Sequence, residues 1–379
     1  MQTGLGPFLA AYLASSGWTP ERLGVLLTVG GLMPIALQTP AGGLVDGARH
    51  KRGLMAGAVA LIAVGALLLG WRTTLPVVLS AQVILAIAGL FVGPVLAAIA
   101  LGIVGPAGFD QQLGKNQSFS AAGNVVTALL MAGVSYWAGI RDIFFCSVVL
   151  TVPTLICLSR IRSSDVDPRL ARGAAAETID HNAGIFRVLL QDRVLLVFFL
   201  CAALFHLSNA AMLPELGEMV ARGHARAAGS LMSACVIVTQ LVIAVAAAGT
   251  GRLAMRVGRR PLLLTGFGAL VVRGWLYTVV RGDTALIAVQ LLDGVANVIF
   301  GVVSVLVVAD RTRGTGRFNL ALGALGTFVG IGAALSTTYG GFLIQRFSYN
   351  ASFLGLAGIG LLAFCVLLLF FPETRDAAE

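Results

Sequence analysis

Long stretches of this 379-residue chain carry no charged side chain. None occurs between Arg72 and Asp110, and the window from Arg317 to Arg346 is equally bare. A helix needs about 20 mostly apolar residues to cross about 30 Å of hydrocarbon, because it rises about 1.5 Å per residue. With 58% of its residues hydrophobic and 11% charged, the chain is far more apolar than a soluble protein. It is predicted to cross a membrane many times.

Twelve apolar segments follow one another, most of them separated by short polar or Gly/Pro-rich connections. The one long polar stretch, 161–193, divides them into six and six. The first segment is too short to span a membrane, and we expect it to be the outer part of a truncated first helix. The predicted segments are 4–14, 22–45, 53–71, 75–104, 113–139, 142–159, 194–221, 227–250, 261–280, 284–309, 318–344 and 350–371.

The basic residues predict the orientation of these spans. If the connections that contain Arg49 and Arg259 face the cytoplasm, 18 of the 26 Lys and Arg residues lie on that side and seven on the other. Such an excess is typical of cytoplasmic loops. It predicts a cytoplasmic C-terminus and explains the net charge of +9 without a nucleic-acid partner.

The two sets of six segments repeat each other weakly. Residues 81–93 align without gaps on 289–301, and further matches occur at the same relative places in both halves. Repeated six-helix halves are typical of secondary transporters, whose substrate sites lie between the repeats. We predict an N-terminal half (1–160), a cytoplasmic linker (161–193) and a C-terminal half (194–379). The matched pairs are Gly42 with Gly251, Gln82 with Gln290, Asn116 with Asn319, and Gly123 with Gly326.

A short motif after the second span of each half resembles the signature loop of the major facilitator superfamily, Gly-x-x-x-Asp-Arg-x-Gly-Arg-Arg/Lys. Met255 stands where the second copy would have its Asp. The sequence FPETR at 371–375 resembles the Pro-Glu-Thr that often follows the last span. The residues that form the motif are Gly42, Asp46, Arg49 and Lys51 in the first half, and Gly251, Arg256, Gly258, Arg259 and Arg260 in the second.

This resemblance implies an all-α membrane protein of twelve transmembrane helices, arranged as two pseudo-symmetric six-helix halves. It also implies that Asp46, with Arg49 and Lys51, latches the halves on the cytoplasmic side. A carboxylate there can join the basic loop and cap a neighbouring helix N-terminus. The alternative is that the charged residues of the motif only anchor the topology.

Three ionisable residues lie deep within predicted spans, where such groups are costly and are functional candidates. Asp293, His206 and Arg273 each lie about ten to twelve residues into a span, and therefore at similar depth. Asp293 either forms a buried ion pair with Arg273 or is a protonatable carboxylate that changes charge during transport. His206 is either a hydrogen-bonded core residue or a proton carrier or substrate ligand.

Amide side chains supply the other candidate ligands. Asn209 follows His206 by three residues and Asn297 follows Asp293 by four, so each pair shares one helix face. We expect these four residues to form one polar patch. The remaining amide candidates for substrate or proton binding are Gln38, Gln82, Gln240 and Gln290.

The resulting prediction is a multi-pass transporter of the inner or plasma membrane that exports a small organic molecule in exchange for protons or another coupling ion, by alternating access. Proton-linked uptake of a metabolite is one alternative, and a non-transporting receptor or assembly protein is another. Because no nucleotide-binding loop, metal-ligand cluster or nucleophile–base pair is found in the sequence, we expect no enzymatic activity, cofactor or metal. We expect the protein to be a monomer.

Overall fold

The computed structural model describes residues 20–173 and 192–375, together with Leu9, Tyr12, Leu13, Ser16 and Trp18. Most of the predicted first segment and much of the predicted linker lie outside these residues. Within them, nine helical stretches are long and apolar enough to cross a membrane. The predicted all-α membrane fold is thereby confirmed, whereas the full count of twelve spans stays a prediction.

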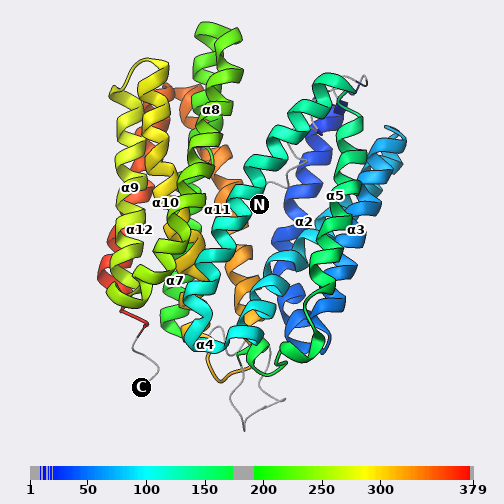
Figure 1. Ribbon diagram of the computed structural model, residues 1–379. Helices are drawn as coiled ribbons and strands as arrows, with labels where there is room; N and C mark the ends of the chain where they lie inside the picture. Colours follow the sequence, from blue (N-terminus) through cyan, green and yellow to red (C-terminus); the bar gives the residue numbers. More distant parts are fainter. Residues whose placement is uncertain are drawn as a thin grey trace. The chain divides into compact units, whose positions relative to one another are not determined.

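The helices follow the charge-free windows of the sequence (Figure 1). Their ends mostly lie within a few residues of the predicted ones, because charged and Gly/Pro-containing connections interrupt the apolar windows. The helices are α2 (Pro20–Gly47), α3 (Lys51–Trp71), α4 (Leu75–Trp137), α5 (Asp142–Ser159), α7 (Arg193–Asn209), α8 (Met212–Val257), α9 (Arg259–Val279), α10 (Asp283–Thr312), α11 (Phe318–Arg346) and α12 (Tyr349–Phe370).

The connection predicted between the fourth and fifth segments is a kink rather than a loop. Helix α4 has 63 residues and bends at Gly105, whose φ of 66° and ψ of 178° are not helical. A positive φ suits glycine, and Pro106 is favoured at the first position of the following helix. The expected loop at 105–112 was therefore wrong: one glycine turns the chain and the helix resumes at once.

The seventh span also differs from the prediction. The helix is interrupted at Ala210–Ala211, inside the predicted span 194–221, and α8 then continues from Met212 to Val257 through the expected turn at 222–226. Pro214 explains the interruption, since a proline inside a helix clashes with the carbonyl group four residues earlier. Arg and His in the expected turn are compatible with helix, so that connection was predicted wrongly.

The chain folds into two compact units. Unit 1 contains Met1–Gly105, Gly123–Thr178 and Gly314–Thr327, and unit 2 contains Pro106–Ala122, Ile179–Arg313 and Phe328–Glu379. The units therefore differ from the predicted halves at 106–122 and 314–327, which cluster with the opposite half. The predicted domain boundaries stay a prediction.

Glycines bring helices together within each unit. In unit 1, a Cβ on Gly42 would collide with the carbonyl oxygen of Asn319, and in unit 2 a Cβ on Gly251 would collide with that of Asp110. The equal roles of Gly42 and Gly251 agree with their predicted match. Because Asn319 contacts Gly42 as Asp110 contacts Gly251, Asn319 corresponds to Asp110 in the repeat. The predicted match of Asn319 with Asn116 was therefore wrong.

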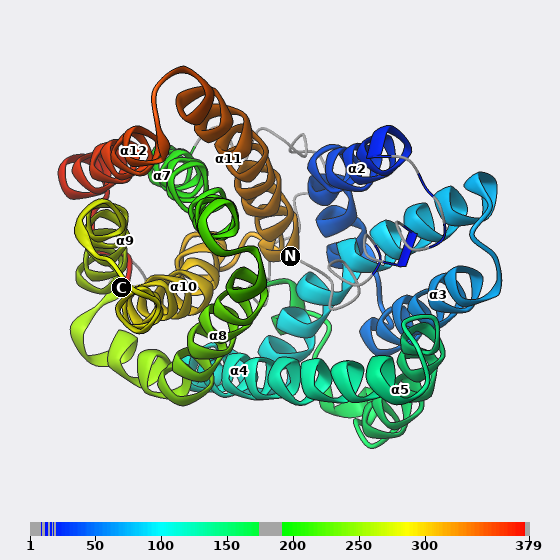
Figure 2. The same ribbon diagram turned by 90° about the horizontal axis from the view of Figure 1, so that it is seen from above.

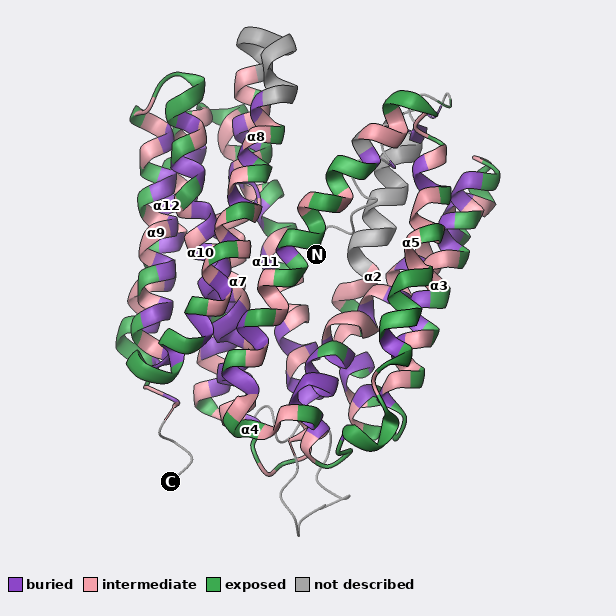
Figure 3. Ribbon diagram, in the orientation of Figure 1, coloured by how far each residue is buried: buried purple, intermediate pink, exposed green. Residues whose placement is uncertain are grey.

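In unit 2, α9 packs against α10 and α12, and α10 also packs against α8 (Figure 2). The helices carry buried and exposed residues along their lengths (Figure 3). Gly266 and Arg273 lie seven residues apart on α9 and so share a face. A Cβ on Gly266 would press on Ile299 of α10, which places the same face of α9, including Arg273, against α10.

Candidate functional site

A buried ion pair joins α9 to α10. The guanidinium group of Arg273 contacts the Oδ1 atom of Asp293, and the two residues are 0% and 6% exposed. The ion-pair alternative for Asp293 therefore describes the structure, while a proton-carrying role stays a prediction. The Nη2 atom of Arg273 also donates to the carbonyl oxygen of Asn209 at 3.4 Å, at the last residue of α7, where a cation is favoured by the helix dipole.

Two further groups hold the carboxylate of Asp293. Thr239 on α8 donates its hydroxyl to Oδ2 at 3.0 Å, and Asn297 donates its amide to Oδ1 at 2.9 Å. The same amide also donates to the carbonyl oxygen of Asp293 at 2.9 Å. Charge-assisted hydrogen bonds of this kind are stronger than neutral ones. Asp293 thus fixes the orientation of Asn297 as well as neutralising Arg273.

The network ends in amide groups. Asn209 donates to Oδ1 of Asn297 at 3.5 Å, and both side chains are only partly buried. Behind them, the Tyr277 hydroxyl donates to Gln290, which is 0% exposed, at 2.7 Å. The amide nitrogen of Gln290 and the Oδ1 atom of Asn209 are buried without a hydrogen-bond partner. The two asparagines, which are only partly buried, therefore form the edge of a polar cluster that is otherwise enclosed.

Among the described residues, His206 is not joined to this cluster by a hydrogen bond or an ion pair. Its ring packs edge-on against Phe300, with centroids 5.0 Å apart, and against Phe205 at 5.4 Å. The expected patch of four residues thus contains Asp293, Asn297 and Asn209, and His206 lies among aromatic rings instead. The other amide candidates are partly buried: Gln240 belongs to unit 2, whereas Gln38 and Gln82 belong to unit 1.

In unit 1, the first copy of the motif caps a helix. The Oδ1 atom of Asp46 accepts the backbone N–H of Asn319 at 3.0 Å and its amide at 2.8 Å, and Oδ2 accepts the N–H of Leu320 at 2.8 Å. These N–H groups begin α11 and would otherwise lack helical partners. Asp46 thus caps a neighbouring helix N-terminus, as the sequence analysis expects of a carboxylate there, whereas its role as a latch between the halves stays a prediction. Lys51 instead donates to the carbonyl oxygen of Val45, and Arg49 is exposed.

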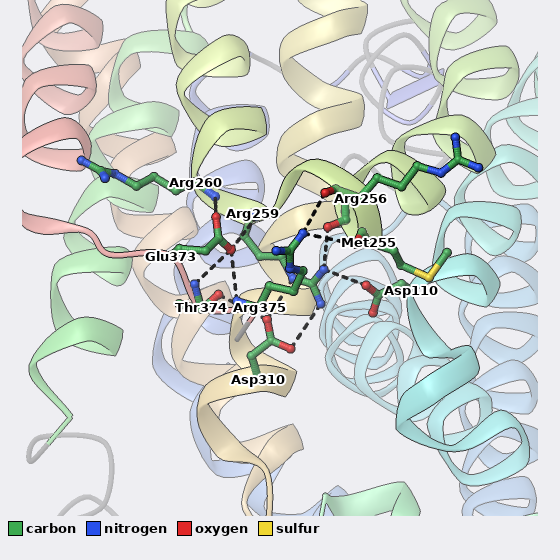
Figure 4. A network of polar contacts seen from close by, with 10 residues as sticks. Asp110, Met255, Arg256, Arg259, Arg260, Asp310, Glu373, Thr374 and Arg375 are labelled. Carbon is green, nitrogen blue, oxygen red and sulfur yellow. Dashed lines mark hydrogen bonds and ion pairs between the residues drawn. The ribbon is translucent and has the colours of Figure 1, made fainter. Parts of the chain in front are cut away.

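In unit 2, the second copy of the motif concentrates acids around one arginine (Figure 4). Arg259 is 4% exposed. Its guanidinium group lies 2.8 Å from Oδ2 of Asp110 and 2.9 Å from Oδ2 of Asp310, and it also donates to the carbonyl oxygen of Ala254. Met255 supplies no acid here, and the two carboxylates that pair with Arg259 come from α4 and α10.

Glu373, in the segment FPETR, caps the N-terminus of α9. It accepts the backbone N–H groups of Arg259 at 2.8 Å and Arg260 at 3.0 Å. Burial raises the pKa of Glu373, but backbone N–H donors from four residues outweigh this effect and hold it below its usual value. Gly258 permits the contact, because its φ is 101° and a Cβ would collide with Glu373.

Three acids of this cluster were missed by the sequence analysis. Asp110 lies in the stretch predicted to be a loop, and Asp310 lies immediately after the predicted tenth span, 284–309. The segment 371–375 was noticed only as a resemblance, although it contains the capping Glu373. Two further arginines of the motif make contacts here. The backbone carbonyl of Arg256 accepts a hydrogen bond from Arg375 at 2.8 Å. The guanidinium group of Arg260 donates to the backbone carbonyl of Leu368.

Comparisons with known proteins agree with this architecture. A family model described as Major Facilitator Superfamily matches residues 1–248 and 198–379. An uncharacterised MFS-type transporter of Mycobacterium tuberculosis (strain CDC 1551 / Oshkosh) is 37% identical over 385 residues, covering 100% of this chain and 91% of the relative. One from strain ATCC 25618 / H37Rv matches equally well.

Solved structures with low sequence identity share the fold. The transporter FucP, solved in the outward conformation, is 13% identical with a TM-score of 0.74, and the match covers 95% of each chain. The proton:xylose symporter XylE is 13% identical with a TM-score of 0.71, covering 98% of this chain and 92% of the other. Similarity at this level of identity concerns the fold alone.

Proposed function

The chain belongs to the major facilitator superfamily, and from that premise we propose that it exports a small organic molecule in exchange for protons. Membership of this family makes it a multi-pass membrane transport protein. The proposal adds the substrate class, the direction and the coupling ion. It also places the protein in the cell membrane, with its C-terminus in the cytoplasm.

The observation that carries the proposed substrate class is the pairing of Arg273 with Asp293. A binding site for an anionic nutrient needs a cation that is available to the ligand. Arg273 is fully enclosed and already neutralised, so it is poorly suited to that purpose. The partly buried edge of the cluster consists of the amides of Asn209 and Asn297, and amides bind neutral polar groups by hydrogen bonds. A hydrogen-bonding organic molecule therefore fits this edge better than an anion.

Export and proton coupling rest on sequence patterns. The first half has no cluster of charged residues deep in its spans, and the predicted lining is apolar, which favours amphipathic compounds over charged nutrients. No nucleotide-binding loop was found in the sequence, so we propose an ion gradient as the energy source. Uptake of a metabolite is the second candidate, favoured by the polar amide edge.

The proposal is tested by comparing the small molecules in cells that make the intact protein, Asn297→Ala, Leu369→Ala or no protein. Leu369 on α12 is 71% exposed and lies outside the polar cluster, so its variant is a matched control. We expect at least one compound to be depleted in cells that make the intact protein or the control, and to return towards normal with Asn297→Ala. Adding a protonophore should abolish the depletion.

Other results would redirect the proposal. Accumulation of a compound instead of depletion would support uptake. If no compound changes while equal amounts of each protein reach the membrane, the non-transporting alternative would be favoured. If Asn297→Ala acts like the intact protein, the amide edge is not the substrate site.

A further inference from the structure

A second buried carboxylate lies outside the cluster around Asp293. Glu215 lies in the first turn of α8 and is 6% exposed. Its Oε2 atom accepts the hydroxyl of Ser352 on α12 at 2.7 Å. Its Oε1 atom is buried and has no hydrogen-bond partner. One oxygen of the carboxylate is therefore held in place, and the other is left without a donor.

The packing around Oε1 is close. A Cβ on Gly340 of α11 would collide with this oxygen, so the carboxylate lies directly against the backbone of α11. The charged neighbour that acts on Glu215 is Glu218, which is also acidic and lies one turn further along α8. In the described part of the chain, no Lys, Arg or His forms an ion pair with Glu215, and no group of three metal-ligating side chains occurs.

Glu215 and Asp293, both buried in unit 2, therefore differ in what they can do. Asp293 has Arg273 as its counter-ion and two side-chain donors. Glu215 has one hydroxyl donor and a like charge nearby. An unpaired carboxylate in an apolar span costs several kcal/mol to keep charged, and the simplest way to remove that cost is to bind a proton. Glu215 is thus better suited than Asp293 to alternate between charged and neutral forms.

The location of Glu215 also favours proton exchange with water. It lies near the end of the predicted seventh span, 194–221, and at the start of α8, the end remote from the arginine-rich motif that follows this helix. The helix is interrupted between α7 and α8, a few residues before Glu215. There the backbone N–H of Ala211 donates to the hydroxyl of Ser336 at 2.9 Å. Interrupted helices commonly form ion and substrate sites in transporters, because they expose polar groups inside the membrane.

We propose that Glu215 is the coupling-proton site of this transporter. The Oε1 atom binds one proton from the aqueous phase, which forms an O–H bond and changes the charge of the side chain from −1 to 0, and it later returns that proton to water. Ser352 keeps its hydrogen bond to Oε2 in both forms. The proton-binding step stands by itself, whereas its role in coupling rests on the proposed function.

Proton binding can be measured without a substrate. Infrared difference spectra of the purified full chain, recorded between acidic and neutral pH, detect the C=O stretch of each carboxylic acid that forms. We expect Glu215→Gln to lose one such band, and the control Leu369→Ala, at an exposed position of α12, to keep it. In Ser352→Ala the band should move to higher frequency, because the C=O group at Oε2 loses its hydrogen bond.

An unchanged set of bands in Glu215→Gln would overturn the proposal, and so would an unshifted band in Ser352→Ala. If Glu215→Gln fails to fold, the Ser352→Ala spectrum decides the question. In liposomes, Glu215→Gln should still exchange the compound identified in cells between equal pools, but should lose its accumulation driven by a pH gradient. If the Glu215 band is present while the intact protein moves no compound, the proposed function fails and the proton site stands.

Discussion

Breaking the ion pair between Arg273 and Asp293 should destabilise the protein strongly. Both side chains are enclosed, at 0% and 6% exposure, so water cannot replace the lost partner. Removing one member of a buried pair costs about 3 to 5 kcal/mol. In Arg273→Met, Thr239 and Asn297 still donate to Asp293, which favours the lower end, about 3 kcal/mol. In Asp293→Asn, Arg273 keeps only a carbonyl oxygen at 3.4 Å, which favours about 4 kcal/mol.

The double variant separates pairing from general damage. With Arg273→Met and Asp293→Asn together, no buried charge is left at this site, and the residual cost should be about 1 kcal/mol from altered hydrogen bonds. The two changes should therefore be non-additive by about 6 kcal/mol. Denaturant titration of the four purified proteins in mixed micelles measures the free energies of unfolding. A double variant that loses the sum of the two single losses would refute the interaction.

Two further predictions concern helix caps, and a third concerns a close glycine contact. Glu373→Gln should lower the free energy of unfolding at neutral pH by about 1 to 2 kcal/mol. Because the pKa of Glu373 is lowered in the folded state, this difference should shrink as the pH falls below about 4.3, and a constant difference in unfolding titrations across pH would contradict it. Asp46→Ala should speed hydrogen exchange at the amide of Asn319 about tenfold, whereas Arg49→Ala should leave it unchanged. Gly42→Leu should reduce thermal stability in detergent, because its Cβ would collide with the Asn319 carbonyl group; unchanged stability would mean that this contact is loose.

Much of the fold could be predicted from charge alone. Apolar windows free of Lys, Arg, Asp and Glu coincide with helices because charged side chains are expensive inside a membrane. Polar connections were harder to predict. The segment at 222–226 is helical because Arg and His do not by themselves end a helix, while the interruption before Pro214 lies within an apolar window and gives no signal in charge.

The candidate site was predictable only in part. Their similar depth in the predicted spans suggested that Asp293 and Arg273 could form an ion pair, and the structure confirms this contact. Depth cannot reveal which way a side chain points, so His206 was assigned to a polar patch although it packs among aromatic rings. Asp110 and Glu373 were missed because their partner, the buried Arg259, is distant in sequence and becomes their neighbour only after the helices pack.

Proton-coupled transport is tested most directly in liposomes that contain the purified protein and the compound identified in cells. An imposed pH gradient should drive the compound in the direction opposite to the protons, and a protonophore should stop this movement. Movement in the same direction as the protons would contradict export by exchange. Movement that continues unchanged without a pH gradient would contradict proton coupling itself.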